Sequence, residues 1–352
     1  MKRTRTSSRK QQHVELALTK DVSFRAKSAG FDRWEFLHNA LPELDLSDVD
    51  PSTRFLGKPV ALPVVVSSMT GGYPEATRIN RQLAEVCAQL GLAMGVGSQR
   101  QALEDRAFHR SFSVVREAAP DIPVFGNIGA VEVARMRTPD PVLRLIDLIR
   151  ADGFAVHLNP VQEFLQPEGD PRFRGVLEGI AMLVRALPVP VIVKEVGSGI
   201  SAEVARRLMD VGIRWIDVAG AGGTSWAAVE IHRRRKPRTL FTGDVFWDWG
   251  IPTAEAIRSV SALRAEVPEL GVIGSGGIRS GLDGAKALAL GANLVGVARP
   301  FLQALHDAGP SGLRGAVEVW AMELKGTMFL AGARTLDELR RKQLIQCDEP
   351  LL

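Results

Sequence analysis

The chain has 352 residues, of which 45% are apolar and 24% charged, and its formal net charge is +4. These values are typical of a soluble globular protein with a large core and argue against an intrinsically disordered chain. No apolar run reaches the roughly 18 residues that a bilayer span needs, and the small net charge does not favour nucleic-acid binding. We therefore expect a cytoplasmic protein without membrane or nucleic-acid partners.

An N-terminal segment, residues 1–59, precedes the regular pattern that fills the rest of the chain. It begins with a basic stretch that includes Arg9 and Lys10, and no apolar segment follows, which predicts neither a signal peptide nor a membrane anchor. We expect it to cap the fold or to contact another subunit, and to become ordered when a ligand binds. The two cysteines, Cys87 and Cys347, are too few and too far apart to suggest a disulfide framework or a metal site.

Eight short apolar runs recur along the chain, and segments with helical periodicity separate most of them. The runs are 60–67, 92–96, 123–127, 154–158, 190–194, 215–218, 271–274 and 294–298. Strands of this composition that alternate with helices indicate a parallel sheet buried on both faces. Eight units allow the sheet to close, so we predict an α/β fold of the (β/α)8 TIM-barrel type over residues 60–335, followed by a C-terminal tail, 336–352. A doubly wound open sheet is the alternative.

In such a barrel the chemistry lies where strands end and loops begin, and each predicted strand leads into polar or glycine-rich residues. The fourth strand has the richest exit, because His157, Asn159, Gln162 and Glu163 follow it within seven residues. A lone histidine at a strand end is more often a satisfied core residue than a catalyst. Four polar groups together favour the rim of an active site.

The seventh strand exit contains Gly276 and Gly277 just before residues 280–292, which have the pattern of a capped helix. Backbone N–H groups ahead of a helix can hold an anion, and barrels often bind phosphate after strands seven and eight. Lys194, at the fifth exit, suits a buried ion pair, an anionic ring or a Schiff base. Neutral hydrogen-bonding groups come from other exits, namely Thr70, Ser98, Asn127 and Thr224. The combination predicts a flavin mononucleotide site.

One connection, residues 224–252, is much longer than the others, and a loop of this length is usually a lid or a binding segment. It contains a basic run, residues 232–238, which we expect to be a solvated loop. A polyanion site is the less favoured alternative, because no regular aromatic residues accompany the run.

These motifs resemble those of the type 2 isopentenyl-diphosphate isomerases, which are flavin-dependent barrels, over nearly the whole chain. The resemblance rests on Arg9-Lys10-x-x-His13, Ser68-Met69-Thr70-Gly71-Gly72, Gly97-Ser98-Gln99-Arg100, His157-x-Asn159-Pro160-x-Gln162-Glu163, Val193-Lys194-Glu195-Val196-Gly197, residues 217–226, Ser275-Gly276-Gly277 and Ala285-Lys286-Ala287. The N-terminal motif together with Asn-Pro-x-Gln-Glu is the specific part. Position 12 departs from the family, being Gln where Asp is frequent.

The resemblance implies reversible conversion of isopentenyl diphosphate to dimethylallyl diphosphate, with reduced FMN as cofactor, NAD(P)H as reductant, Mg2+ on the diphosphate, and a homo-oligomer (tetramer or octamer). It places FMN against Ser68, Met69, Thr70, Ser98, Asn127, Lys194 and Thr224, with Gly276, Gly277, Ile278, Arg279, Ala298 and Arg299 around its phosphate. It places the substrate diphosphate on Arg9, Lys10, Ser98, Gln99 and Arg100, Mg2+ on Glu163, Gln162 beside the reacting carbons, and His13, His157 and Asn159 as orienting groups.

Two other functions fit the same scaffold. An FMN-dependent 2-hydroxy-acid or related dehydrogenase would change the redox state of its substrate, but such oxidases usually carry a late His-Gly-x-Arg arrangement that this sequence lacks. A flavin-binding interaction protein would have no use for Glu163 or for the Arg9 and Lys10 pair.

Overall fold

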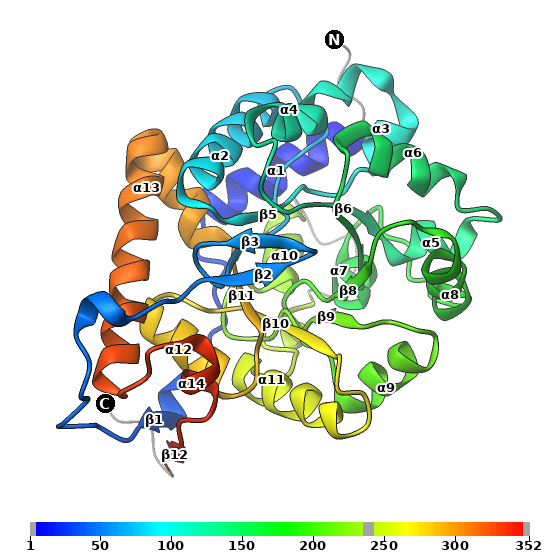
Figure 1. The fold of residues 1–352 in the computed structure, drawn as a ribbon. Helices are drawn as coiled ribbons and strands as arrows, with labels where there is room; N and C mark the ends of the chain where they lie inside the picture. Colours follow the sequence, from blue (N-terminus) through cyan, green and yellow to red (C-terminus); the bar gives the residue numbers. More distant parts are fainter. Residues whose placement is uncertain (1–4, 235–242, 348–352) are drawn as a thin grey trace.

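A computed structural model describes residues 5–234 and 243–347 of the chain, and it contains a closed barrel of eight parallel strands (Figure 1). The barrel strands are β4 (Val64–Val66), β5 (Ala93–Gly95), β6 (Val124–Gly129), β7 (Gly153–His157), β8 (Val191–Lys194), β9 (Trp215–Asp217), β10 (Gly271–Ser275) and β11 (Leu294–Val297). They are hydrogen-bonded in the order β10-β11-β4-β5-β6-β7-β8-β9, which closes the sheet. The (β/α)8 prediction is confirmed, and the open doubly wound sheet is wrong.

Helices surround the barrel, because their apolar faces cover the outward side chains of the strands (Figure 1). They are α2 (Ala76–Leu90), α3 (Arg100–Glu104), α4 (Arg110–Ala118), α5 (Ala130–Arg135), α6 (Asp140–Ile149), α7 (Pro160–Leu165), α8 (Val176–Ala186), α9 (Ala202–Asp210), α10 (Trp226–Arg233), α11 (Thr253–Ser261), α12 (Gly281–Ala289), α13 (Arg299–Leu330) and α14 (Leu336–Arg340). Helix α13 is interrupted at Ala308 and Gly309, where the backbone leaves helical geometry ahead of Pro310.

A hairpin lies in the middle of the barrel when it is viewed as in Figure 1. It consists of β2 (Thr53–Phe55) and β3 (Lys58–Val60), which pair antiparallel. Phe55 is 1% exposed and makes edge-on ring contacts with Phe125 and Trp215, so it packs with the inward side chains of the barrel. The predicted first strand, 60–67, is therefore too long, because Val60 belongs to this hairpin and the barrel strand starts at Val64.

The N-terminal segment begins with helix α1 (Arg5–Thr19), which packs on α10 and α13 (Figure 1). Farther along, β1 (Trp34–Phe36) pairs antiparallel with β12 (Leu344–Gln346) near the other end of the chain. Short 3-10 turns complete the structure: η1 (Phe31–Arg33), η2 (Leu46–Asp48), η3 (Arg106–Phe108), η4 (Asp244–Phe246) and η5 (Ala262–Ala265). No helix in the described ranges has the length and apolar character needed to cross a bilayer.

Candidate active site

Two adjoining cavities lie where the barrel strands end and their loops begin. The larger has a volume of about 1610 Å3 and the smaller about 840 Å3. Six residues line both: His13, Ser68, Met69, Lys194, Val196 and Trp226. Ligands in the two cavities would therefore meet across this shared border.

The larger cavity is lined by ten of the residues that the sequence assigned to FMN. They are Ser68, Met69, Lys194, Thr224, Gly276, Gly277, Ile278, Arg279, Ala298 and Arg299. The glycines are structurally required here, because a Cβ on Gly276 would lie 2.2 Å from the Gly220 carbonyl oxygen, and both Gly276 and Gly277 have positive φ, at 104° and 71°. The bare backbone suits the close approach of a phosphate group.

The hydroxyl of Ser68 lies at the border of the two cavities and is buried without a hydrogen-bond partner among the described residues. A buried polar atom without a partner is costly, so this position suits a ligand that supplies one. Arg299, by contrast, already donates hydrogen bonds to the carbonyl oxygens of Ala17 and Lys20, and these bonds fasten the end of α1 to the cavity wall. The lining, the glycine backbone and the free hydroxyl together fit a flavin mononucleotide.

Lys194 lies on the shared border with a buried carboxylate behind it. Its Nζ is 3.9 Å from Asp217 Oδ2, and Asp217 is only 4% exposed. Burial raises the pKa of Asp217, while Lys194 and the hydroxyl of Ser275 act in the opposite direction. Lys194 also donates to the backbone oxygen of Glu195. The contact with Asp217 fits the ion-pair interpretation of Lys194.

The next carboxylate, Glu195, accepts hydrogen bonds from the backbone N–H groups of Val196, Gly197 and Ser198 at 2.7, 2.7 and 2.5 Å. Burial raises its pKa to about 7 in spite of these donors. Glu195 therefore shapes the loop that carries Val196 and Gly197 into the larger cavity.

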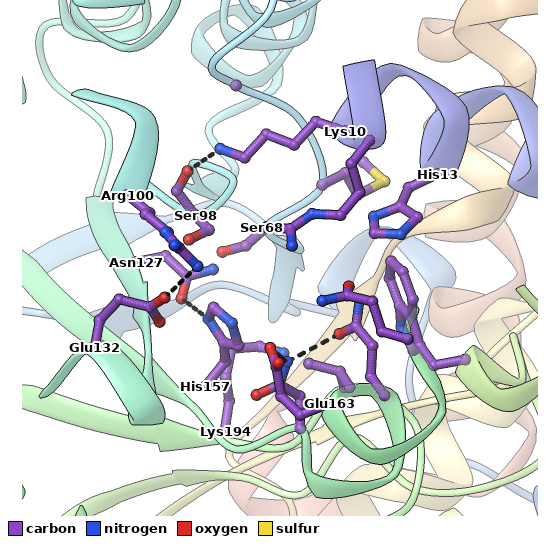
Figure 2. A pocket seen from close by; sticks show the side chains of 18 residues that line it. Lys10, His13, Ser68, Ser98, Arg100, Asn127, Glu132, His157, Glu163 and Lys194 are labelled. Carbon is purple, nitrogen blue, oxygen red and sulfur yellow. Dashed lines mark hydrogen bonds and ion pairs between the residues drawn. The ribbon is translucent and has the colours of Figure 1, made fainter. Parts of the chain in front are cut away.

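The smaller cavity has a cationic side formed by Arg9, Lys10 and Arg100. Lys10 reaches in from α1 and donates to the backbone oxygen of Ser98, as Figure 2 shows. Burial, together with the neighbouring charge of Arg9, lowers the pKa of Lys10 to about 7. Arg100 is held by Glu132 at 2.7 Å and by Glu104 at 2.9 Å. A polyanion such as a diphosphate would complement this side of the cavity.

His157 lies across the cavity from α1 (Figure 2), and its Nδ1 is 2.8 Å from Asn127 Oδ1. Burial lowers the pKa of His157 to about 3, with the charges of Lys194 and Lys10 adding to the effect. The imidazole is therefore neutral near pH 7. With Nδ1 donating to Asn127, Nε2 remains a hydrogen-bond acceptor, which suits an orienting group and not a charged acid.

A chain of side-chain contacts crosses the remaining side of the cavity. Glu230, on α10, is fully buried, and its Oε1 lies 2.8 Å from His13 Nε2 and accepts from Gln162 Nε2 at 3.3 Å. Asn159 Nδ2 in turn donates to Gln162 at 3.0 Å and to Glu163 at 3.1 Å. Burial alone would raise the pKa of Glu230, but the hydrogen bonds and charges of His13 and Arg233 outweigh it and lower the pKa. These contacts fix the amide of Gln162.

Glu163 also accepts from the backbone N–H of Asp170 at 2.7 Å. Burial raises its pKa, against the effect of Asn159 and the nearby arginines. Among the described residues, no group of three or more His, Cys, Asp or Glu side chains is arranged to hold a metal ion. A Mg2+ ion at Glu163 would therefore need phosphate oxygens and water as its other ligands, which is a common arrangement for this ion.

Four sequence assignments need revision. Gln99 is fully buried, and its amide bonds to the Leu145 carbonyl oxygen and the Asn127 N–H, so it supports the floor and does not line either cavity. Thr70 is 2% exposed and donates to Asn80, also away from both cavities. Ser98 and Asn127 line the smaller cavity and not the larger one in which the flavin fits.

The long connection after β9, expected to be a lid or a binding segment, contains helix α10. This helix places Trp226 in the lining of both cavities and Glu230 against His13 and Gln162. In the basic run, Arg233 is not solvated but pairs with Glu230 and Glu168, both at 2.5 Å. Residues 235–238 of the run lie outside the described residues. Glu230 was not among the predicted site residues. Its one signal in the sequence is that it lies four residues after Trp226, just beyond the glycine-rich exit of the sixth predicted strand.

A family model and individual proteins of known name both match the sequence of this chain. Residues 2–113 and 157–346 match the family model described as FMN-dependent dehydrogenase. An isopentenyl-diphosphate delta-isomerase of Pelodictyon phaeoclathratiforme is 49% identical over 351 residues, covering 97% of this chain and 98% of its own. One from Nostoc sp. is 46% identical, covering 97% of this chain and 96% of its own.

Solved structures with the same fold are more distant in sequence. A mandelate oxidase has a TM-score of 0.65 at 20% identity, covering 97% of this chain and 95% of its own. A flavocytochrome b2 with pyruvate bound has a TM-score of 0.67 at 19% identity, covering 95% and 82%. At these identities the similarity concerns the fold alone.

Proposed function

The chain belongs to the isopentenyl-diphosphate delta-isomerase family and is an isomerase of the FMN type, and from this premise we propose that it interconverts isopentenyl and dimethylallyl diphosphate by a 1,3-proton shift. The proposal includes reduced FMN in the larger cavity, Mg2+ on the diphosphate and NAD(P)H as the reductant. The observation that carries it is the shared border between a cavity that fits a flavin and a smaller one with a cationic side. A diphosphate on that side would hold a short hydrocarbon chain against the flavin.

When bound, reduced FMN supplies an electron-rich ring that exchanges a proton with the allylic carbons and stabilises the positive charge that develops on a protonated alkene. The residues around it position the substrate. Arg9, Lys10 and Arg100 bind the diphosphate, and Glu163 holds Mg2+ against it. His157, neutral because of its lowered pKa, orients the substrate without adding a positive charge beside the developing cation.

Gln162 is the side chain that we place beside the reacting carbons. Its amide is fixed between Asn159 and Glu230, and only 9% of the residue is exposed. The ionised Glu230 also holds His13, whose ring meets Trp226 edge-on at 5.1 Å, so α1 and α10 close the cavity together. A cavity covered in this way would limit the access of water to a reaction in which positive charge develops on carbon.

The metal assignment is tested by Glu163→Gln, with Glu132→Gln as the matched control from the same cavity. We expect the first variant to need at least about tenfold more Mg2+ for half-maximal turnover, because a carboxylate ligand is lost. The second should leave the Mg2+ requirement unchanged. Equal Mg2+ requirements for Glu163→Gln and the unsubstituted enzyme would refute the assignment.

The assignment of Gln162 is tested by Gln162→Ala under anaerobic conditions with reduced FMN. We expect bound flavin, measured by absorbance, to be retained while turnover falls by roughly a hundredfold or more, as when a group that contacts the transition state is removed. Full turnover with flavin bound would contradict the role of Gln162.

A further inference from the structure

A third cavity lies between the first half of helix α8 and the middle of helix α9, and it shares no lining residue with the two cavities of the active site. Both helices lie on the outside of the barrel (Figure 1). Helix α8 packs on α5 and helix α9 on α11, and the cavity occupies the space between α8 and α9. Its volume is about 990 Å3, which is in the range of small-molecule sites.

Most of the residues that line this third cavity are apolar. Ile180 and Leu208 are 0% and 3% exposed, whereas Phe173, Leu177 and Val204 are half-buried. The half-buried side chains pack against the core on one side, and the rest of their apolar surface is open to the cavity. Because the removal of such surface from water is favourable, the cavity suits a ligand with a hydrocarbon portion.

Two arginines also line the third cavity. Arg174 and Arg207 are exposed, and neither has an ion-pair partner within residues 5–234 and 243–347. Arg206, by contrast, points away from the lining and pairs with Glu266 at 2.9 Å. Glu178 is the one carboxylate among the described lining residues, so positive charge is in excess there. Two guanidinium groups suit a phosphate group, whose oxygens can accept hydrogen bonds from both.

The third cavity also reaches the back of the active-site loop. Leu158 and Pro160 line it, while Asn159 between them lines the smaller cavity of the active site. Asn159 donates hydrogen bonds to Gln162 and Glu163, and helix α7, which carries both, begins at Pro160. A ligand that packs against Leu158 and Pro160 therefore contacts the segment that positions the amide of Gln162.

We propose that the third cavity binds a soluble amphiphilic anion, an aliphatic chain that ends in a phosphate group, and that its binding lowers turnover. The chain covers Phe173, Leu177 and Val204, and the phosphate accepts hydrogen bonds from Arg174 and Arg207. Turnover falls because the ligand shifts the start of α7, and a displacement of about 1 Å in the geometry of a site is enough to slow a reaction substantially. The effect on turnover rests on the proposed function, whereas binding does not.

Isothermal titration of the FMN-loaded protein with octyl phosphate tests the binding site. The double variant with Arg174→Ala and Arg207→Ala should bind at least about tenfold more weakly, because two charge-assisted hydrogen bonds are lost. Arg206→Ala is the matched control from the same helix and should bind as the unsubstituted protein does. A probe held only in the smaller cavity would be unaffected by either change. Equal affinities for the double variant and the control would therefore overturn the site, as would no binding at all, the result expected if a second copy of the chain covers the groove.

Related probes test the two ends of the ligand. Hexyl phosphate should bind roughly tenfold more weakly than octyl phosphate, because each buried CH2 group contributes to affinity. Inorganic phosphate, octan-1-ol and octanoate should each bind at least about fivefold more weakly, because they lack the chain, the head group or one of its charges. Equal affinities across these probes would refute the amphiphilic anion. Vesicles that contain phosphatidic acid should not sediment the protein, and sedimentation would indicate a membrane surface in place of a soluble ligand.

The effect on turnover is measured at a saturating concentration of isopentenyl diphosphate, where competition in the smaller cavity no longer contributes. Octyl phosphate should lower the turnover of the unsubstituted protein and of Arg206→Ala by at least about fivefold, a usual strength for coupling between two sites. The double variant should keep its turnover at the same probe concentration. Turnover that octyl phosphate leaves unchanged in the unsubstituted protein would overturn the regulatory effect. A protein without isomerase activity would contradict the proposed function, and the titration would still decide the binding site.

Discussion

The pKa of Lys10 provides a quantitative test of the cationic side of the smaller cavity. Burial and the charge of Arg9 lower this pKa to about 7 when no anion is bound. A bound diphosphate would raise it, because an opposite charge within a few ångströms favours the ammonium form. Binding therefore takes up a proton above pH 7, and affinity falls as pH rises until the pKa of the complex is reached.

The size of the effect follows from the fraction of Lys10 that is protonated. With a pKa near 7, affinity should fall roughly fifteenfold between pH 7 and pH 8.5. The substrate does not contribute in this range, since the last phosphate pKa is about 6. Lys10→Arg is the matched control, because the guanidinium keeps its charge at these pH values and its affinity should stay nearly flat.

The assay is isothermal titration of the FMN-loaded protein with isopentenyl diphosphate, in buffers of different ionisation enthalpy that report proton uptake. The unsubstituted protein should take up close to one proton per diphosphate at pH 8.5, and Lys10→Arg close to none. Equal proton uptake by the two proteins would refute the assignment of Lys10.

Three further predictions concern the frame of the site. Asp217→Asn removes the carboxylate 3.9 Å from Lys194 Nζ. The midpoint potential of bound FMN should then become more positive, by about 30 mV for each tenfold gain in relative affinity for the reduced form. Spectroelectrochemistry measures this potential, and a more negative value would contradict the reasoning. Arg116→Ala deletes the guanidinium of a 4% exposed residue, which is bonded to Asp152 at 2.6 Å and to five carbonyl oxygens. Urea titration should therefore show a loss of about 3–5 kcal/mol in the free energy of unfolding. The exposed Arg110→Ala should lose less than about 1 kcal/mol, and equal losses for the two variants would contradict the structural role of Arg116. Gly276→Ala should weaken FMN binding by at least about tenfold, because its Cβ collides with backbone at positive φ; fluorescence titration of FMN measures this, and unchanged affinity would show that the cradle does not hold the phosphate.

The barrel was predictable from sequence because its strands are buried on both faces and appear as continuous apolar runs. The run predicted at 154–158, for example, is observed as the strand Gly153–His157, whose last residue, His157, lines the smaller cavity. Most residues predicted at the strand exits line one of the two cavities, since the carboxyl ends of all eight strands meet at one edge. The predicted start of the first strand was wrong because Val60 is apolar like the barrel strands but pairs antiparallel within the β2-β3 hairpin.

The features that sequence did not predict depend on contacts between distant parts of the chain. Glu230 is buried in α10 because His13, over 200 residues earlier, and Arg233 stabilise its charge. No local pattern records such a partnership. Gln99 was predicted to bind the diphosphate, but its amide bonds to the backbone of Leu145 and Asn127. Some side chains at a strand exit point into the cavity and others support the backbone beneath the cavity, and the sequence does not distinguish the two kinds.

The central claim is that the chain isomerises a diphosphate on reduced FMN, and one assay tests it most directly. Purified protein with FMN, NADPH and Mg2+ is incubated anaerobically with isopentenyl diphosphate in D2O, and the products are followed by proton NMR. We expect dimethylallyl diphosphate that carries solvent deuterium, and no conversion when the flavin stays oxidised. Absence of dimethylallyl diphosphate with flavin demonstrably bound and reduced would contradict the proposed function.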